Sequence, residues 1–241
     1  MELQEVMKGL YRITEWIMRL STVNVLWILC SSPFFYLIAV MWSSPEGGYG
    51  QWTFTVTLAA IFAPFTLFPA TTATFAVARN WVTRNEEVPF VKNFFRSYKE
   101  NYKQSMVGGF IFVVLAVILY WNYKFYSSLD NLLGAIALIM PVFFAIYLSM
   151  LCYFFSHLVH LSMGIGKIMK NAFVLSLGRP VASLMMLVTN FSLVYLSLKF
   201  TFFLPFFLGS TIAITTFLNF YLTYHKIQTK VKLTKNEGDK C

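Results

Sequence analysis

The chain has 241 residues, of which 58% are hydrophobic and 12% are charged, and its formal net charge is +9. A soluble domain carries roughly 45–50% apolar and about 25% charged residues, so this composition excludes an ordinary soluble protein and indicates a polytopic membrane protein. Loops on one side of a membrane, close to anionic lipid headgroups, explain the positive charge, and we expect no nucleic-acid partner.

The first predicted element is an amphipathic helix over residues 2–19, whose pattern of charged and apolar side chains is typical of a helix at a membrane surface. The first membrane span follows at about 23–41, and its length leads us to expect a retained span rather than a cleaved signal peptide. The second span, at about 54–78, contains Pro64 and Pro69, which predict a kinked helix.

A basic segment, residues 79–105, comes next and contains six Lys and Arg residues. Within it, cationic residues at spacings of four, three and four predict an amphipathic helix over 91–103, with aromatic side chains beside the basic stripe. We expect this helix to lie on anionic lipid, and docking of a soluble partner is the alternative. The candidate lipid or partner surface consists of Lys92, Phe94, Phe95, Arg96, Tyr98, Lys99 and Lys103.

Four further apolar runs complete the predicted transmembrane domain, which covers residues 1–225 as a single unit. These spans lie at about 106–120, 132–161, 181–198 and 204–224. Residues 226–241 form a basic tail, for which the polar composition predicts a disordered cytoplasmic segment.

The distribution of positive charge predicts the topology. With six spans, 17 of the 19 Lys and Arg residues fall on one side, because only Lys124 and Lys199 lie opposite. This asymmetry predicts that both termini are cytoplasmic. The predicted fold is therefore all-α, with six transmembrane helices as three hairpins, each preceded by a basic or amphipathic cytoplasmic interfacial helix.

Two of these units also share residue types at equal offsets. Lys, Asn, Phe and Ser recur with the same spacing in the second and third units, so an internal repeat and a chance match both stay open. The matched positions are Lys92 and Lys170, Asn93 and Asn171, Phe95 and Phe173, and Ser105 and Ser183.

No catalytic residues, cofactor site or metal site are predicted. The chain has no HExxH, GxSxG or Walker-type motif, and its three cysteines have no metal-type spacing. His157 and His160 share a helical face, but with no third ligand in sight we interpret them as structural side chains rather than metal ligands.

Uncharged polar residues within the apolar runs are the remaining candidates for a site. The predicted spans have no acidic residue in their middle, so we interpret these polar groups as interhelical hydrogen bonds, with a solute path as the alternative. The candidates are Asn24, Thr71, Thr72, Thr74, Asn190 and Asn219.

Several stretches of the N-terminal half resemble the YesL-like family of bacterial integral membrane proteins, which is named for a domain of unknown function. They are GLYRI from Gly9, STVNVLW from Ser21, PATTATFAVAR from Pro69 and FFRSYKENYKQS ending at Ser105. The resemblance implies a six-span protein of the bacterial cytoplasmic membrane. It also implies an accessory role in sugar uptake or sensing, beside an ABC importer or a sensor protein.

From these features we expect a non-enzymatic membrane accessory or scaffold protein, with a small-solute transporter or channel as the alternative. The expected partners are anionic lipids at the cytoplasmic face and an importer or sensor protein. Phe94, Phe95, Arg96 and Tyr98 are the positions at which we expect partner contact, because aromatic residues and Arg are enriched at interface hot spots.

Overall fold

The computed structural model describes residues 2–43, 48–84, 89–129 and 132–238, with side chains described for 7, 9–43, 48, 50–84, 89–129 and 134–229. Every regular element in these ranges is helical, which confirms the all-α prediction. In chain order the α-helices are α1 (Glu2–Cys30), α2 (Ser32–Ser43), α3 (Tyr49–Phe62), α4 (Leu67–Val82), α5 (Phe90–Ser127), α6 (Met140–His160), α7 (Ile165–Gly178), α8 (Pro180–Lys199), α9 (Phe203–Phe206) and α10 (Leu208–Gly238). A 3₁₀-helix, Leu132–Leu138, precedes α6.

Helix α4 is the centre of the molecule and packs against α1, α5, α6 and α10. Most of its buried residues are Ala or Thr, whose small side chains let neighbouring helices approach closely. At Gly109 of α5 the approach is close, since an added Cβ would lie 2.8 Å from the Cα atom of Pro64 and 2.9 Å from the ring of Phe68. The core of the protein is therefore built from small residues around α4, with large aromatic side chains such as Phe75 and Phe112 filling the remaining space.

Four helices are long and apolar enough to cross a membrane, judged by length and composition: Gly9–Cys30, Phe90–Ser127, Gly134–His160 and Pro180–Lys199. A fifth span results if α3 and α4, bent by 51° where they meet, count as one broken span. This bend follows Phe62 and includes Pro64, and it confirms the kink predicted from the prolines.

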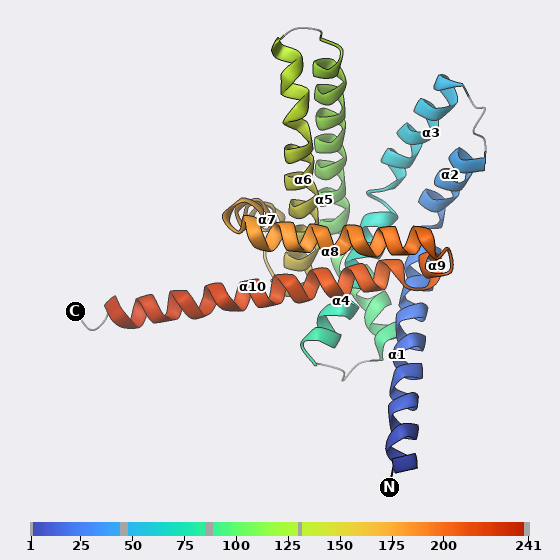
Figure 1. Cartoon of the computed structure of the whole chain (residues 1–241), viewed down its shortest axis with the longest axis vertical. Helices are drawn as coiled ribbons and strands as arrows, with labels where there is room; N and C mark the ends of the chain where they lie inside the picture. Colours follow the sequence, from blue (N-terminus) through green and yellow to red (C-terminus); the bar gives the residue numbers. More distant parts are fainter. Residues whose placement is uncertain (1, 44–47, 85–88, 130–131, 239–241) are drawn as a thin grey trace.

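The arrangement of six spans in three hairpins is not confirmed. In Figure 1, α5 and α6 rise side by side to one end of the molecule, whereas α8 and α10 run across them. Large apolar side chains on α8 are exposed along one side of the helix, as expected for a surface that faces lipid. They are Val181, Leu184, Met185, Val188, Phe191, Tyr195 and Leu198.

Two predicted boundaries need correction. The amphipathic segments 2–19 and 91–103 are not separate interfacial helices, because α1 and α5 continue through them into the apolar runs that follow. No Gly or Pro lies between Phe90 and Val107, so nothing in the sequence ends the helix there. Of the three units, only the third has a separate amphipathic helix, α7, before its apolar run.

The C-terminal tail also differs from the prediction of disorder. Helix α10 continues to Gly238, and residues 239–241 lie outside the described residues. After Gly209 the helix contains no Gly or Pro until Gly238, which is a typical residue for a helix end. The tail contains five Lys residues, one Gln and one Leu, which are good helix formers, so polarity alone does not predict disorder here.

Candidate functional site

The N-terminal half of α5 carries a basic stripe, which we define as Lys92, Arg96, Lys99 and Lys103. All four side chains are exposed. The opposite face of the same turns is buried, with Phe94 fully enclosed in a cluster with Val23 of α1 and Trp81 of α4. The basic stripe is therefore held on a rigid support, because the back of its helix is part of the protein core.

This burial corrects part of the predicted contact surface. Phe94 is 0% exposed and belongs to the core, whereas its neighbour Phe95 is 44% exposed. Tyr98 is half-buried and packs beside Phe94, with ring centroids 6.5 Å apart. Of the aromatic candidates, Phe95 is thus the one that a partner or lipid can contact fully.

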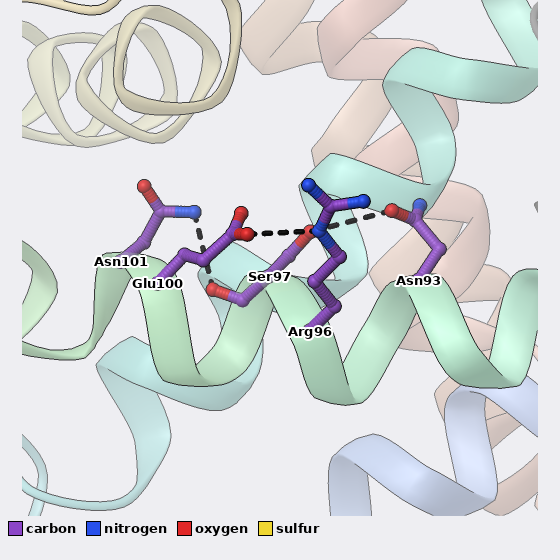
Figure 2. A network of polar contacts seen from close by, with 5 residues as sticks. All are labelled: Asn93, Arg96, Ser97, Glu100 and Asn101. Carbon is purple, nitrogen blue, oxygen red and sulfur yellow. Dashed lines mark hydrogen bonds and ion pairs between the residues drawn. The ribbon is translucent and has the colours of Figure 1, made fainter.

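Figure 2 shows the polar contacts along this part of α5. Arg96 and Glu100 form an ion pair, with Nε 2.8 Å from Oε1. Both side chains are largely exposed, so water and salt screen the pair and it adds little to stability. Among the described side chains Glu15 and Glu100 are the only carboxylates, and each pairs with an arginine four residues away. The three lysines of the basic stripe have no ion-pair partner within this set.

Two buried side chains lie beside the ion pair. The hydroxyl of Ser97 donates to Oδ1 of Asn93 over 3.4 Å, and Nδ2 of Asn101 donates to the Ser97 carbonyl over 3.1 Å. Nδ2 of Asn93 is buried and has no hydrogen-bond partner in the described part of the chain. Polar groups thus extend from the surface of α5 toward the helices behind it.

A polar cavity of about 260 Å³ opens where α4, α5 and the end of α6 meet. Arg79 of α4 lines it, and Nη1 of Arg79 donates to the carbonyl of Val159 at the end of α6. Glu100 also lines this cavity, so it connects the basic stripe to the polar cavity. The remaining lining residues are Ala76, Ser97, Asn101, Leu158, His160, Leu161 and Ser162.

The two histidines of α6 make structural contacts. Nδ1 of His157 is 2.8 Å from the Tyr153 carbonyl. The ring of His160 lies against aromatic rings of α10, including Phe220 at 5.8 Å and Tyr224 at 5.4 Å between centroids. In the described residues no three His, Cys, Asp or Glu side chains come together as a metal site.

Asn24 joins α1 to α9 and to the first turn of α10. Its Nδ2 donates to the carbonyls of Pro205 at 2.7 Å and Leu204 at 3.2 Å. Its Oδ1 accepts from the backbone N–H groups of Gly209 at 2.7 Å and Ser210 at 3.2 Å. One fully buried amide thus satisfies backbone groups at a helix break, where apolar surroundings would leave them unpaired.

Other candidate polar residues also bond between helices. Nδ2 of Asn190 on α8 donates to Thr216 of α10 at 2.9 Å, and the indole N–H of Trp27 donates to Thr71 at 3.0 Å. The hydroxyl of Ser105 donates to Thr72 at 2.7 Å, which links α5 to α4.

The last two candidates differ from this pattern. The hydroxyl of Thr74 donates to the Ala70 carbonyl within α4. Asn219 lies apart from the others, at a second cavity beside the start of α8. These contacts favour the structural interpretation of the polar groups, with Asn219 as the exception.

The polar cavity contains residues that sequence reasoning did not single out, namely Ser97, Asn101 and Ser162. Ser97 and Asn101 come from α5 and Ser162 from the segment after α6, so no local spacing brings all three together. One signal was present: the stretches PATTATFAVAR and FFRSYKENYKQS, which carry the family resemblance, supply Arg79 and Ser97 to the same cavity.

Comparison with known proteins gives family relations but no activity. Residues 20–123 match the model of a family described as "Protein of unknown function, DUF624". The uncharacterized protein YesL of Bacillus subtilis (strain 168) is 29% identical over 215 residues, which cover 88% of this chain and 88% of that protein. The uncharacterized protein YteU of the same organism is 29% identical over 202 residues, covering 84% of this chain and 79% of that protein.

A third relative, the uncharacterized protein YesV of the same organism, is 27% identical over 159 residues, covering 66% of this chain and 76% of that protein. No solved structure matches the chain significantly. The resemblance predicted from the sequence is confirmed, since residues 20–123 match the DUF624 family model and most of the chain is similar to YesL and YteU, both of unknown function.

Proposed function

We propose that this protein is a non-enzymatic membrane accessory protein that docks an acidic segment of a protein partner on the basic stripe of α5. The observation that carries the proposal is the continuity of α5. The helix has 38 residues, or about 57 Å at 1.5 Å each, whereas the hydrocarbon core of a bilayer is about 30 Å thick. A helix of this length extends well beyond the membrane at one end.

The basic stripe lies at the end that extends. Lys92 precedes Met106, the start of the apolar run, by about 21 Å along the helix axis. Attraction to anionic headgroups falls off within a Debye length, about 8 Å at physiological salt. Lys92 and Arg96 are therefore placed to meet an acidic protein surface, while Lys103 stays near the headgroups.

The partner class that the family resemblance implies is a carbohydrate ABC importer or a sensor protein, and it is part of this proposal. Three features of the surface support a protein partner: a row of exposed cations, the half-exposed ring of Phe95 and the polar cavity beside Glu100. An Arg side chain next to an aromatic ring is a common composition at interface hot spots.

We also propose that both termini are cytoplasmic and that the membrane is the bacterial cytoplasmic membrane, with six spans. The distribution of Lys and Arg supports this topology, since all but Lys124 and Lys199 fall on one side. The bent pair α3–α4 would be the second span, and α8 and α10 the fifth and sixth. Because α8 and α10 run across α5 and α6 in Figure 1, the charge distribution alone supports the six-span count.

The topology can be tested by thiol labelling of Cys241 after Cys30 and Cys152 are replaced. We expect a membrane-impermeant reagent to label Cys241 only in inside-out vesicles or opened cells. Labelling in intact cells whose outer barrier has been removed would contradict the six-span topology.

The docking proposal can be tested with Lys92→Gln, Lys99→Gln and Lys103→Gln combined, which leaves the Arg96–Glu100 pair in place. A control of equal charge combines Lys167→Gln, Lys170→Gln and Lys199→Gln. Partners that copurify from native membranes are measured by quantitative mass spectrometry at low and high salt. We expect the stripe variant to copurify about tenfold less partner protein, or even less, than the parent at low salt. High salt should reduce the amount bound to the parent in the same way, and the control variant should keep its partners at low salt.

The alternative is a solute path through the membrane, and the same variants separate it from docking. Flux of a small solute into liposomes that contain only this protein would support the path. If that flux is lost on Asn190→Leu or Asn219→Leu, and the stripe variant behaves like its control, the transporter interpretation replaces ours.

A further inference from the structure

A second cavity, of about 490 Å³, lies where α7 turns into α8 and faces α10. It is lined by residues 178–182 at the α7–α8 junction and by Met185 of α8. From α10 it is lined by Asn219, Leu222, Thr223 and Lys226. Two helices that are distant in sequence therefore enclose a space of ligand size.

The charge of this cavity is positive. Arg179 and Lys226 both line it, and none of its lining residues within the described part of the chain is a carboxylate. Neither cation has an ion-pair partner among the described side chains. The first turn of α8 adds to this field, because Arg179 is its N-cap residue and no side chain caps the turn.

An unpaired hydroxyl points to a polar ligand in the same place. Thr223 is 6% exposed, lines the cavity, and has no hydrogen-bond partner among the described residues. Almost every other Thr hydroxyl described in the apolar helices donates to a carbonyl four residues back, as Thr215 does to Thr211. The Thr223 oxygen is not one of the fully enclosed polar atoms, so its hydroxyl is open to the cavity and free to donate to a ligand atom there.

Apolar side chains continue the cavity along its outer side. Val181 is 72% exposed, Met185 61% and Leu222 54%. Next to the junction, α7 also exposes apolar residues, among them Phe173 and Leu177. A free anion would gain nothing from such surroundings, whereas a lipid would place its acyl chains against them.

We propose that this cavity binds the phosphodiester headgroup of an anionic phospholipid. Arg179 and Lys226 neutralise the phosphate, the uncapped N–H groups at the start of α8 and the Thr223 hydroxyl donate to its oxygens, and the acyl chains lie along Val181, Met185 and Leu222. Asn219, one of the predicted polar candidates, lines the same cavity and lies beside the headgroup. This site is independent of the basic stripe on α5.

The test uses the purified full-length protein in a neutral detergent, with phosphatidylglycerol as the probe and phosphatidylcholine as the reference. Native mass spectrometry counts bound lipid and gives the dissociation constant. We expect phosphatidylglycerol to bind with one dominant site, and Arg179→Gln with Lys226→Gln to weaken it about tenfold or more. The control, Lys167→Gln with Lys170→Gln, removes the same charge nearby but outside the cavity, and should change binding less than about twofold.

A second variant keeps the test valid if the double variant inserts poorly. Thr223→Val has the same shape and charge and removes only the hydroxyl, and we expect it to weaken phosphatidylglycerol about three- to tenfold. Equal weakening by the control pair would show general electrostatic attraction and overturn the site. If sn-glycerol 3-phosphate binds as tightly as phosphatidylglycerol, the site takes a soluble phosphate, and the assignment to lipid is wrong.

Discussion

Residues 92–105 and residues 170–183 carry Lys, Asn, Phe and Ser at the same spacing, but the two segments fold differently. In α5, Lys92, Asn93 and Ser105 belong to one helix that runs on to Ser127. In the second region the counterparts of Lys92 and Ser105, Lys170 and Ser183, lie on two helices, because the chain breaks between α7 and α8 at Arg179.

The break has a local cause. Gly178 and Pro180 flank Arg179, whose backbone is not helical, whereas α5 has neither residue before Gly108. Other properties are shared, since Phe95 and Phe173 are both about half exposed, and Ser105 and Ser183 are both buried. A two-residue difference in helix breakers thus decides whether the basic helix continues into the apolar run that follows, as α5 does, or ends before it, as α7 does.

The largest effect is expected when α5 is broken in the same way. Gln104→Pro removes a backbone hydrogen bond and places a proline ring inside the helix, which costs about 3 kcal/mol or more. Pro180→Ala should cost less than about 1 kcal/mol, because Pro180 is the first residue of α8, where the N–H that proline lacks would have no acceptor within the helix. The change in the free energy of unfolding is measured for both variants in detergent. A cost of Gln104→Pro no larger than that of Pro180→Ala would mean that α5 is already interrupted.

The next largest effect concerns the buried face of the basic half of α5. Phe94→Ala should destabilise the protein by about 3–5 kcal/mol, because its ring is fully enclosed against α1 and α4. Phe95→Ala and Phe173→Ala serve as matched controls and should each cost less than about 1 kcal/mol, since both rings are half exposed. The same unfolding assay applies, and equal costs for Phe94→Ala and Phe95→Ala would show that this face is open.

The smallest effect concerns the shared serines. Ser105 donates to Thr72 at 2.7 Å, and Ser183 donates to the Ser176 carbonyl at 3.0 Å. Each bond joins neighbouring helices, so Ser105→Ala and Ser183→Ala should each cost about 1 kcal/mol. Their costs are measured in parallel against Ser192→Ala, an exposed serine that bonds only within α8. If Ser105→Ala and Ser183→Ala cost no more stability than Ser192→Ala, the two shared serines do not stabilise contacts between helices.

The sequence predicts the class of the fold well because long apolar runs have few alternatives to helices in a membrane. It predicts the kink between α3 and α4 for a local reason, the proline that follows Phe62 by two residues. The continuity of α5 was missed because an amphipathic pattern is equally consistent with a separate surface helix. Only the absence of Gly and Pro before Gly108 indicated otherwise.

The candidate site could be predicted only in part. Spacing identifies the basic stripe, since residues three and four apart share a helical face. It does not distinguish Phe94 from Phe95, because the positions of α1 and α4 decide which ring is buried. The polar cavity and the second cavity, beside the start of α8, are each lined by segments that are distant in sequence. Arg179 and Lys226 in the second cavity are an example, so neither cavity follows from local sequence.

The central claim is that the basic half of α5 stands clear of the membrane on the same axis as its apolar half. The measurement uses protein without its native cysteines, reconstituted in bilayers, with one spin label at a time placed at positions from 92 to 118. The accessibility of each label to oxygen and to a water-soluble nickel complex reports its depth in the bilayer. We predict that labels at Lys92 and Arg96 are in water and that depth begins to increase near Met106, by about 1.5 Å per residue. A constant headgroup depth across residues 92–103 would contradict the account, because it would place this segment flat on the membrane.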